Sequence, residues 1–131
     1  MKLGIRESTP GRTTVESVVL LPNAARAEID PLKLHGYLLN PSHQVGRFKA
    51  RFFAALGYVA EEWQTLEADF RIQHLSQPAE PGPQEPHGQG WTIRAILTGP
   101  NGQSASVVSV WFFRPNSDVP HFVTAYPGDV L

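Results

Sequence analysis

The chain has 131 residues, of which 41% are hydrophobic and 10% aromatic, a composition that supports a folded domain with a core and excludes disorder throughout. It has no cysteine, which excludes disulfides, iron–sulfur clusters, thiol catalysis and cysteine zinc sites and is compatible with a reducing cytoplasm. The formal net charge of −1 gives no general argument for nucleic acid. Neither a membrane-spanning run nor the apolar start of a signal peptide occurs, so we expect a cytoplasmic protein.

The charges are unevenly distributed along the chain. No acidic residue occurs between residues 31 and 60 or between residues 86 and 117, whereas six of the twelve acidic residues lie between residues 61 and 85. If the two acid-free stretches pack together, they form a local positive surface suited to phosphate. Ordinary solvated faces would produce the same pattern.

The first part of the chain predicts a short strand and a helix. Residues 14–21 are rich in β-branched side chains, which indicates a strand. Asp30 followed by Pro31 is typical of a helix start, because an acidic N-cap accepts a backbone N–H and proline suits the first helical position. We therefore expect a first helix over residues 32–39.

The next helix is expected over residues 47–56. Three of its apolar residues recur at every fourth position, which predicts one buried stripe, and two arginines fall on the opposite, solvated side. The stripe consists of Phe48, Phe52 and Leu56, and the arginines are Arg47 and Arg51.

The remainder of the chain predicts a third helix and then strands. The helix is expected over residues 61–74, where two leading glutamates complement the helix dipole. Residues 77–89 contain four prolines and two glycines, so we expect an exposed, irregular loop there. Three strands separated by turns should follow, over residues 91–98, 104–113 and 121–126.

Together these elements predict an α+β fold, with N-terminal helices packed on one face of a C-terminal antiparallel β-meander. Residues 1–13 are polar and glycine-punctuated, which indicates a flexible extension. Residues 14–131 are expected to form a single domain.

Metal and cofactor chemistry find little support in the sequence. The five histidines include no pair at i, i+4 spacing and no partner carboxylate at a metal-ligand spacing. Residues 99–102 are better explained as a hairpin turn than as a phosphate-binding loop, and no nucleophile elbow or triad occurs. We therefore expect neither a metal ion nor another cofactor.

The remaining candidates form a metal-free acid–base set. His43 precedes the basic helix, Gly46 permits close backbone approach of a ligand, and the helix start offers N–H groups to an anion. Lys49 lies at the margin of the buried helix face, and Thr124 and Tyr126 share one face of the last strand. If that face meets the helix, these side chains converge. Structural roles fit them equally: a loop cap for His43, a stem along the core for Lys49 and a packed aromatic for Tyr126.

Several motifs of the chain are similar to those of a small bacterial domain family of unknown function, whose members also occur at the ends of larger phage-related and toxin-like proteins. The similarity extends from about Val19 to Pro127. The motifs are Leu21-Pro22-Asn23-Ala24, Tyr37-Leu38-Leu39-Asn40, His43, Val45-Gly46, Lys49-Ala50, Phe52-Phe53, Gly99-Pro100-Asn101-Gly102, Val110-Trp111 and Val123-Thr124-Ala125-Tyr126-Pro127.

That family in turn resembles the barnase–EndoU–colicin–RelE group of ribonuclease folds, in which helices precede a curved antiparallel sheet. The resemblance implies a metal-independent endoribonuclease toxin or effector, in which the ribose 2′-hydroxyl attacks the adjacent phosphorus. Because no glutamate stands where barnase-type enzymes place a general base, the base is expected to be His43 or a less basic group that acts mainly by orientation, and we assign proton transfer to His43. In the other implied roles, Lys49 with Arg47 stabilises the phosphorane charge, Thr124 and Tyr126 hold the phosphate, and Arg47, Arg51, Gly46 and Trp111 bind the RNA.

The resemblance also implies partners, namely RNA and a small neutralising antitoxin or immunity protein. The oligomeric state stays open. The main alternative is a non-catalytic RNA- or protein-binding module, such as an antitoxin, an immunity protein or a phage accessory protein. A metal-dependent nuclease comes third, because the basic segments lack clustered carboxylates.

Overall fold

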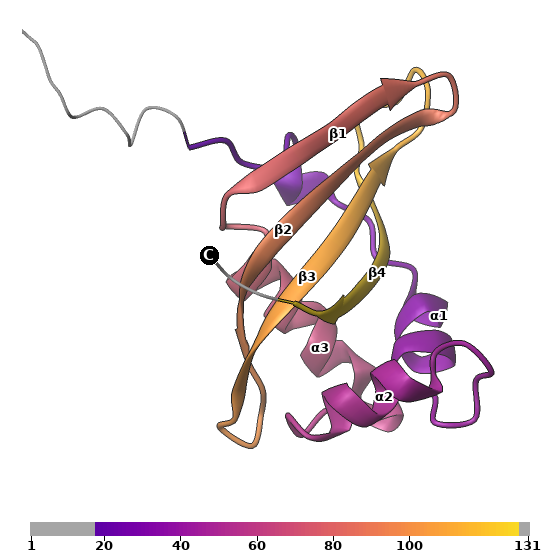
Figure 1. Cartoon of the computed structure of the whole chain (residues 1–131), viewed down its shortest axis with the longest axis vertical. Helices are drawn as coiled ribbons and strands as arrows, with labels where there is room; N and C mark the ends of the chain where they lie inside the picture. Colours follow the sequence, from indigo (N-terminus) through magenta and orange to yellow (C-terminus); the bar gives the residue numbers. More distant parts are fainter. Residues whose placement is uncertain (1–17, 129–131) are drawn as a thin grey trace, which may run out of the picture.

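The computed structural model describes residues 18–128, in which short helices precede a four-stranded sheet (Figure 1). None of the helices in this range is long and apolar enough to cross a membrane. The helical elements are η2 (Ala24–Arg26), α1 (Pro31–Lys33), η3 (Leu34–Leu38), α2 (Arg47–Ala54), η4 (Ala60–Glu62), α3 (Trp63–Asp69) and η5 (Phe70–His74).

The predicted start of the first helix is confirmed. The carboxylate of Asp30 accepts a hydrogen bond from the backbone N–H of Leu32 at 2.9 Å, and Pro31 occupies the first helical position. The helix then continues from α1 into the π-helical turns of η3. These turns bring Tyr37 beside Thr124 of the last strand, at the edge of the sheet.

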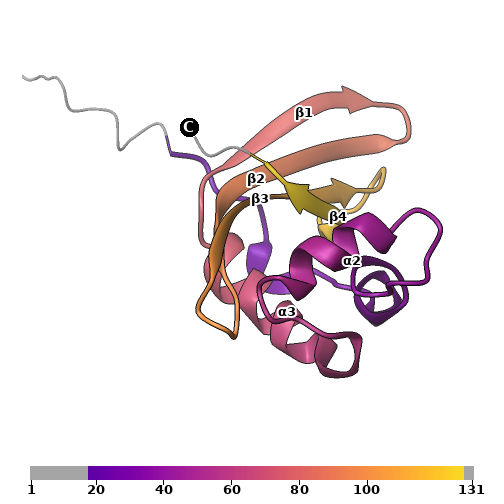
Figure 2. The same cartoon turned by 60° about the horizontal axis from the view of Figure 1, so that its bottom comes forward.

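The strands form an antiparallel meander in the order β1-β2-β3-β4, and the helices cover one face of it (Figure 2). This arrangement confirms the α+β prediction. A register shift between Val110 and Trp111 on β3 leaves Val123 of β4 as an extra residue, so the strand bends at that point. The strands are β1 (Ala79–Glu85), β2 (Gly88–Thr98), β3 (Ser104–Phe113) and β4 (His121–Pro127).

The expectation of an irregular loop over residues 77–89 is wrong, because most of this segment pairs with β2 as strand β1. β1 is an edge strand, so only one of its sides must supply ladder hydrogen bonds, and prolines are tolerated there. The pairing shifts between Pro81 and Gln84, where the proline-rich stretch interrupts the ladder.

The predicted N-terminal strand, residues 14–21, falls partly within the described residues. Residues 14–17 lie outside them. Leu20 makes a single antiparallel bridge with Pro78, and no strand is formed over residues 18–21.

The predicted stripe on α2 is wrong in its phase. Phe48 is 61% exposed, whereas Phe53 is completely buried and Phe52 is only partly buried. The buried face of α2 therefore follows the spacing of Ala50 and Phe53, and it continues to the buried Leu56 just beyond the helix.

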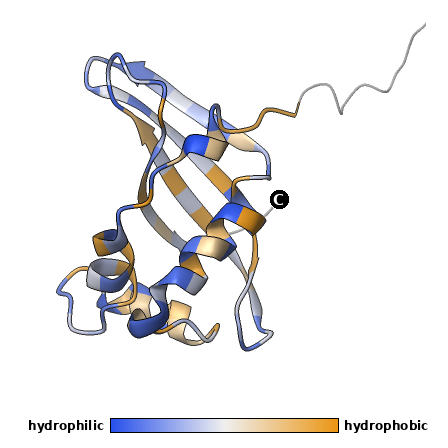
Figure 3. Cartoon of the chain, turned by 180° about the vertical axis from the view of Figure 1, so that it is seen from behind, coloured by the Kyte–Doolittle hydropathy of each residue, from blue (hydrophilic) through white to orange (hydrophobic). Residues whose placement is uncertain are grey.

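The core lies between the sheet and the helices. Seen from the helix side, the strands behind α3 carry apolar residues (Figure 3). Within this core the indole N–H of Trp111 donates to Ser109 Oγ at 2.9 Å, and Ser109 Oγ lies 2.8 Å from His74 Nδ1. The largest fully buried side chains include Phe53, Leu66, Phe70, Ile93, Leu97 and Trp111.

Candidate functional site

A half-buried tyrosine joins three elements at the edge of the sheet. The Oη of Tyr37, on η3, accepts a hydrogen bond from Nζ of Lys49 on α2 at 2.8 Å. The same Oη lies 3.3 Å from Oγ1 of Thr124 on β4. The lysine can only donate, whereas either hydroxyl can be the donor in the contact between Tyr37 and Thr124. The three side chains therefore form one polar cluster, which we call the Tyr37 cluster.

The pKa of Tyr37 is lowered from its ordinary value. Burial acts to raise this pKa, but hydrogen bonds from Lys49 and Thr124 and the positive charges of Lys49 and Lys33 outweigh it. A phenol with a depressed pKa releases its proton more readily than free tyrosine. The Tyr37 cluster is thus a place where a proton can move and where positive charge faces an incoming anion.

His43 lies beside the Tyr37 cluster, with its ring edge-on to Tyr37 and 5.1 Å between ring centroids. Its Nδ1 accepts hydrogen bonds from the backbone N–H groups of Val45 at 3.0 Å and Gly46 at 2.9 Å. An accepting Nδ1 carries no proton, so the neutral ring holds its proton on Nε2. In this geometry His43 caps the loop before α2, and its Nε2 offers a donor rather than the lone pair that a general base requires.

Gly46 serves the packing of the chain rather than the approach of a ligand. A Cβ at this position would lie 2.4 Å from the carbonyl oxygen of Tyr37 and 2.8 Å from its ring. Any larger residue would therefore displace Tyr37 from its contacts.

The two arginines of α2 lie on the solvated side, as the sequence predicted. The guanidinium of Arg47 lies over the exposed ring of Phe48, 4.6 Å from its centroid, and that of Arg51 lies 5.8 Å from the same centroid. Arg47 also donates to the carbonyl oxygen of Gln44. These side chains form a basic, aromatic patch that the expected burial of Phe48 had excluded.

The two remaining predicted residues, Trp111 and Tyr126, differ in burial. Trp111 is completely buried and donates to Ser109 within the core, so the expectation that it binds substrate is wrong. Tyr126 lies two residues beyond Thr124 on β4, opposite Val108, and is half-buried. Within residues 18–128, no hydrogen bond joins Tyr126 to the Tyr37 cluster.

The sequence reasoning missed Tyr37 as a functional candidate. The only sequence signal was its place in the Tyr37-Leu38-Leu39-Asn40 motif, because its contacts depend on three elements that are far apart in the chain. Across the described part of the chain, no group of three histidine, aspartate or glutamate side chains could hold a metal ion.

Comparison with known proteins identifies the family. The sequence profile of the domain of unknown function DUF6883 matches residues 20–129, and the chain belongs to this family. No curated protein matches the chain. The fold is similar to one chain of a contact-dependent growth inhibition toxin–immunity protein complex from Klebsiella pneumoniae 342, with a TM-score of 0.51 and 17% sequence identity over 82% of this chain and 97% of that chain.

Proposed function

We propose that this member of the DUF6883 family is a metal-independent endoribonuclease of the toxin class, with Tyr37 and Lys49 at its reactive centre. The observation that carries the proposal is the 2.8 Å hydrogen bond between a lysine ammonium and a tyrosine whose pKa is lowered. The similarity in fold to a chain of a toxin–immunity protein complex supports the same class. A neutralising partner protein is part of this proposal.

The reaction requires a base, an acid and positive charge at one phosphate. In its deprotonated form, which the neighbouring ammonium of Lys49 stabilises, Tyr37 takes the proton of the ribose 2′-hydroxyl, whose oxygen then bonds to phosphorus. The ammonium of Lys49 stabilises the charged phosphoryl oxygens and gives a proton to the departing 5′-oxygen as the P–O bond breaks. The products are a 2′,3′-cyclic phosphate and a 5′-hydroxyl.

The hydrogen bond between the two side chains resets the pair. After one turnover Tyr37 holds an extra proton and Lys49 lacks one, and transfer across the 2.8 Å contact restores both. Thr124 orients the phenol from the sheet side, and the Nε2–H of His43 provides a donor to a phosphoryl oxygen. His43 therefore takes a positioning role in place of proton transfer.

Incubation of the purified chain with bulk tRNA in EDTA tests the proposal. We expect cleavage that leaves 2′,3′-cyclic phosphate ends, and Lys49→Met should lower its rate about 10²–10³-fold, the usual loss when one donor to a developing oxyanion is removed. Arg94→Met is the matched control, because Arg94 is exposed on β2 between the buried Ile93 and Ala95.

Two results would contradict the proposal. Undiminished cleavage by Lys49→Met would remove Lys49 from the reaction. RNA binding without any cleavage by the wild-type chain would favour the non-catalytic binding module, which the similarity to a toxin–immunity protein complex also accommodates, since that similarity concerns the fold alone.

A further inference from the structure

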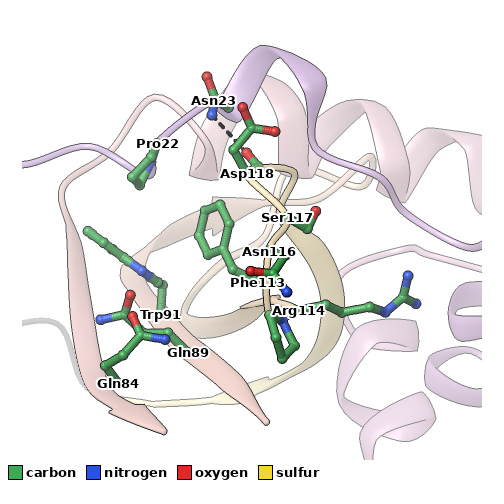
Figure 4. A pocket seen from close by; sticks show the side chains of 11 residues that line it. Pro22, Asn23, Gln84, Gln89, Trp91, Phe113, Arg114, Asn116, Ser117 and Asp118 are labelled. Carbon is green, nitrogen blue, oxygen red and sulfur yellow. Dashed lines mark hydrogen bonds between the residues drawn. The ribbon is translucent and has the colours of Figure 1, made fainter. Parts of the chain in front are cut away.

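A second polar site lies at the other end of β4 from Thr124. It is a hollow of about 710 Å³ between the β1–β2 hairpin, the turn after β3 and the segment before η2 (Figure 4). Residues 113–118 of the turn line it, and β4 leads from there to Thr124. The nearest lining residue along the chain, Asp118, is six residues from Thr124, a span of at most about 20 Å at 3.3 Å per residue. The hollow is therefore separate from the Tyr37 cluster, within reach of the same RNA strand.

Two aromatic rings line the hollow at a steep angle to each other. Trp91 and Phe113 extend into it from neighbouring strands, with their ring centroids 6.3 Å apart and their planes at 65° (Figure 4). Trp91 is only 9% exposed, whereas Phe113 is half-buried. A planar ligand can therefore stack on the ring of Phe113, with the indole of Trp91 beside it.

Side-chain carboxamides surround these two rings. Asn23 donates to the backbone carbonyl of Asp118 at 2.7 Å and Gln89 donates to that of Gly82 at 2.9 Å, so each amide is fixed and its oxygen stays available as an acceptor. Gln84 and Asn116 also line the hollow, and neither side chain has a hydrogen-bond partner among residues 18–128.

The charged groups of the hollow point to a ligand whose buried part is neutral. Asp118 is paired with Arg26 at 2.9 Å, so its charge is compensated. Arg114 extends away from the two aromatic rings (Figure 4), where it can meet a phosphate outside the hollow. A flat neutral ring with a donor and acceptor edge, attached to an anionic backbone, describes a nucleobase of single-stranded RNA.

We propose that this hollow binds one nucleobase of the RNA substrate, on the same strand as the phosphate that the Tyr37 cluster acts on. The proposal rests on the proposed ribonuclease function, because cleavage is what brings RNA to this side of the sheet. Stacking on Phe113 provides affinity, and the carboxamide groups select the base edge.

Titration of the ¹⁵N-labelled, full-length Lys49→Met variant with AMP, GMP, CMP and UMP tests the proposal. We expect at least one nucleotide to shift the indole N–H signal of Trp91 and the side-chain amide signals of Gln84 and Asn116. Ribose 5-phosphate and glucose are the control probes, because they carry the sugar and phosphate, or a neutral ring, without a base.

Added substitutions assign the binding to the hollow. Asn116 has a φ of 62°, so Asn116→Gly removes the amide and keeps a backbone conformation that glycine adopts freely. Combined with Gln84→Ala, it should weaken nucleotide binding at least tenfold. Gln103→Ala is the matched control, because Gln103 is exposed in the turn at the opposite end of the β2–β3 hairpin.

The outcomes separate this proposal from the proposed function. Cleavage of RNA without any nucleotide-dependent shift at Trp91 would overturn the nucleobase site alone. Nucleotide binding in the hollow without RNA cleavage would support the site and overturn the ribonuclease. Equal shifts with ribose 5-phosphate or glucose, or undiminished binding by the double substitution, would show that the hollow does not recognise a base.

Discussion

Two hydrogen-bonded chains of three side chains connect the helices to the sheet, and they differ in burial. Trp111, Ser109 and His74 lie wholly within the core. Lys49, Tyr37 and Thr124 lie at the sheet edge and are each partly exposed. The comparison separates polar groups that stabilise the fold from polar groups that a ligand can reach.

The pKa values follow the same division. Burial lowers the pKa of His74 to about 4, so this histidine is neutral at physiological pH and serves as a hydrogen-bond partner. The pKa of Tyr37 is also lowered, but there the charges and hydrogen bonds of neighbouring side chains outweigh burial. The first shift is a consequence of packing, whereas the second is the kind of shift expected at a reactive site.

The largest expected effect on stability comes from removing Ser109, the central side chain of the buried hydrogen-bonded group. Ser109→Ala leaves the indole N–H of Trp111 without its acceptor and Nδ1 of His74 without its hydrogen-bond partner. At about 1–3 kcal/mol for each unsatisfied group, the free energy of unfolding should fall by roughly 2–6 kcal/mol in urea titrations.

Thr124→Ala is the contrasting variant, because Thr124 is the sheet-side member of the partly exposed Tyr37 cluster. It should lower the free energy of unfolding by about 0.5–1.5 kcal/mol, the net value of one hydrogen bond, and reduce RNA cleavage. Equal losses of stability in the two variants would remove the distinction between the buried hydrogen-bonded group and the Tyr37 cluster.

A further effect on stability follows from pH. The pKa of His74 is about 4 in the folded state against about 6.5 in the unfolded chain, so only the unfolded chain takes up a proton as the pH falls from 6.5 to 4. Stability from His74 is therefore fully present above pH 6.5 and is lost below it. At 1.36 kcal/mol per pKa unit, we expect a loss of about 3 kcal/mol by pH 4, measured by denaturant titration.

His74→Asn tests this assignment, because the side-chain amide can replace Nδ1 as the hydrogen-bond partner of Ser109 but does not titrate. The variant should be less stable overall and show a flatter dependence of stability on pH. His87→Gln, which changes an exposed histidine, should keep the wild-type slope. An unchanged slope in His74→Asn would assign the acid sensitivity to other groups.

The sequence was informative where structure depends on neighbouring residues and failed where it depends on distant ones. Asp30 and Pro31 predicted the helix start because capping is local. The edge position of β1 and the burial of Phe53 in place of Phe48 depend on what each element packs against. Several candidate site residues were named from sequence, but Tyr37, which lies within hydrogen-bond distance of two of them, was not, because no local pattern reports a contact 87 residues away.

The central claim is that the phenol of Tyr37 moves a proton in RNA cleavage, and Tyr37→Phe tests it most directly. The substitution keeps the ring and removes only Oη, so the free energy of unfolding should change by no more than about 1.5 kcal/mol. Measured on the same RNA, kcat/KM should fall about 10²–10⁴-fold, the usual contribution of a general acid or base. Wild-type kcat/KM in Tyr37→Phe would contradict the claim.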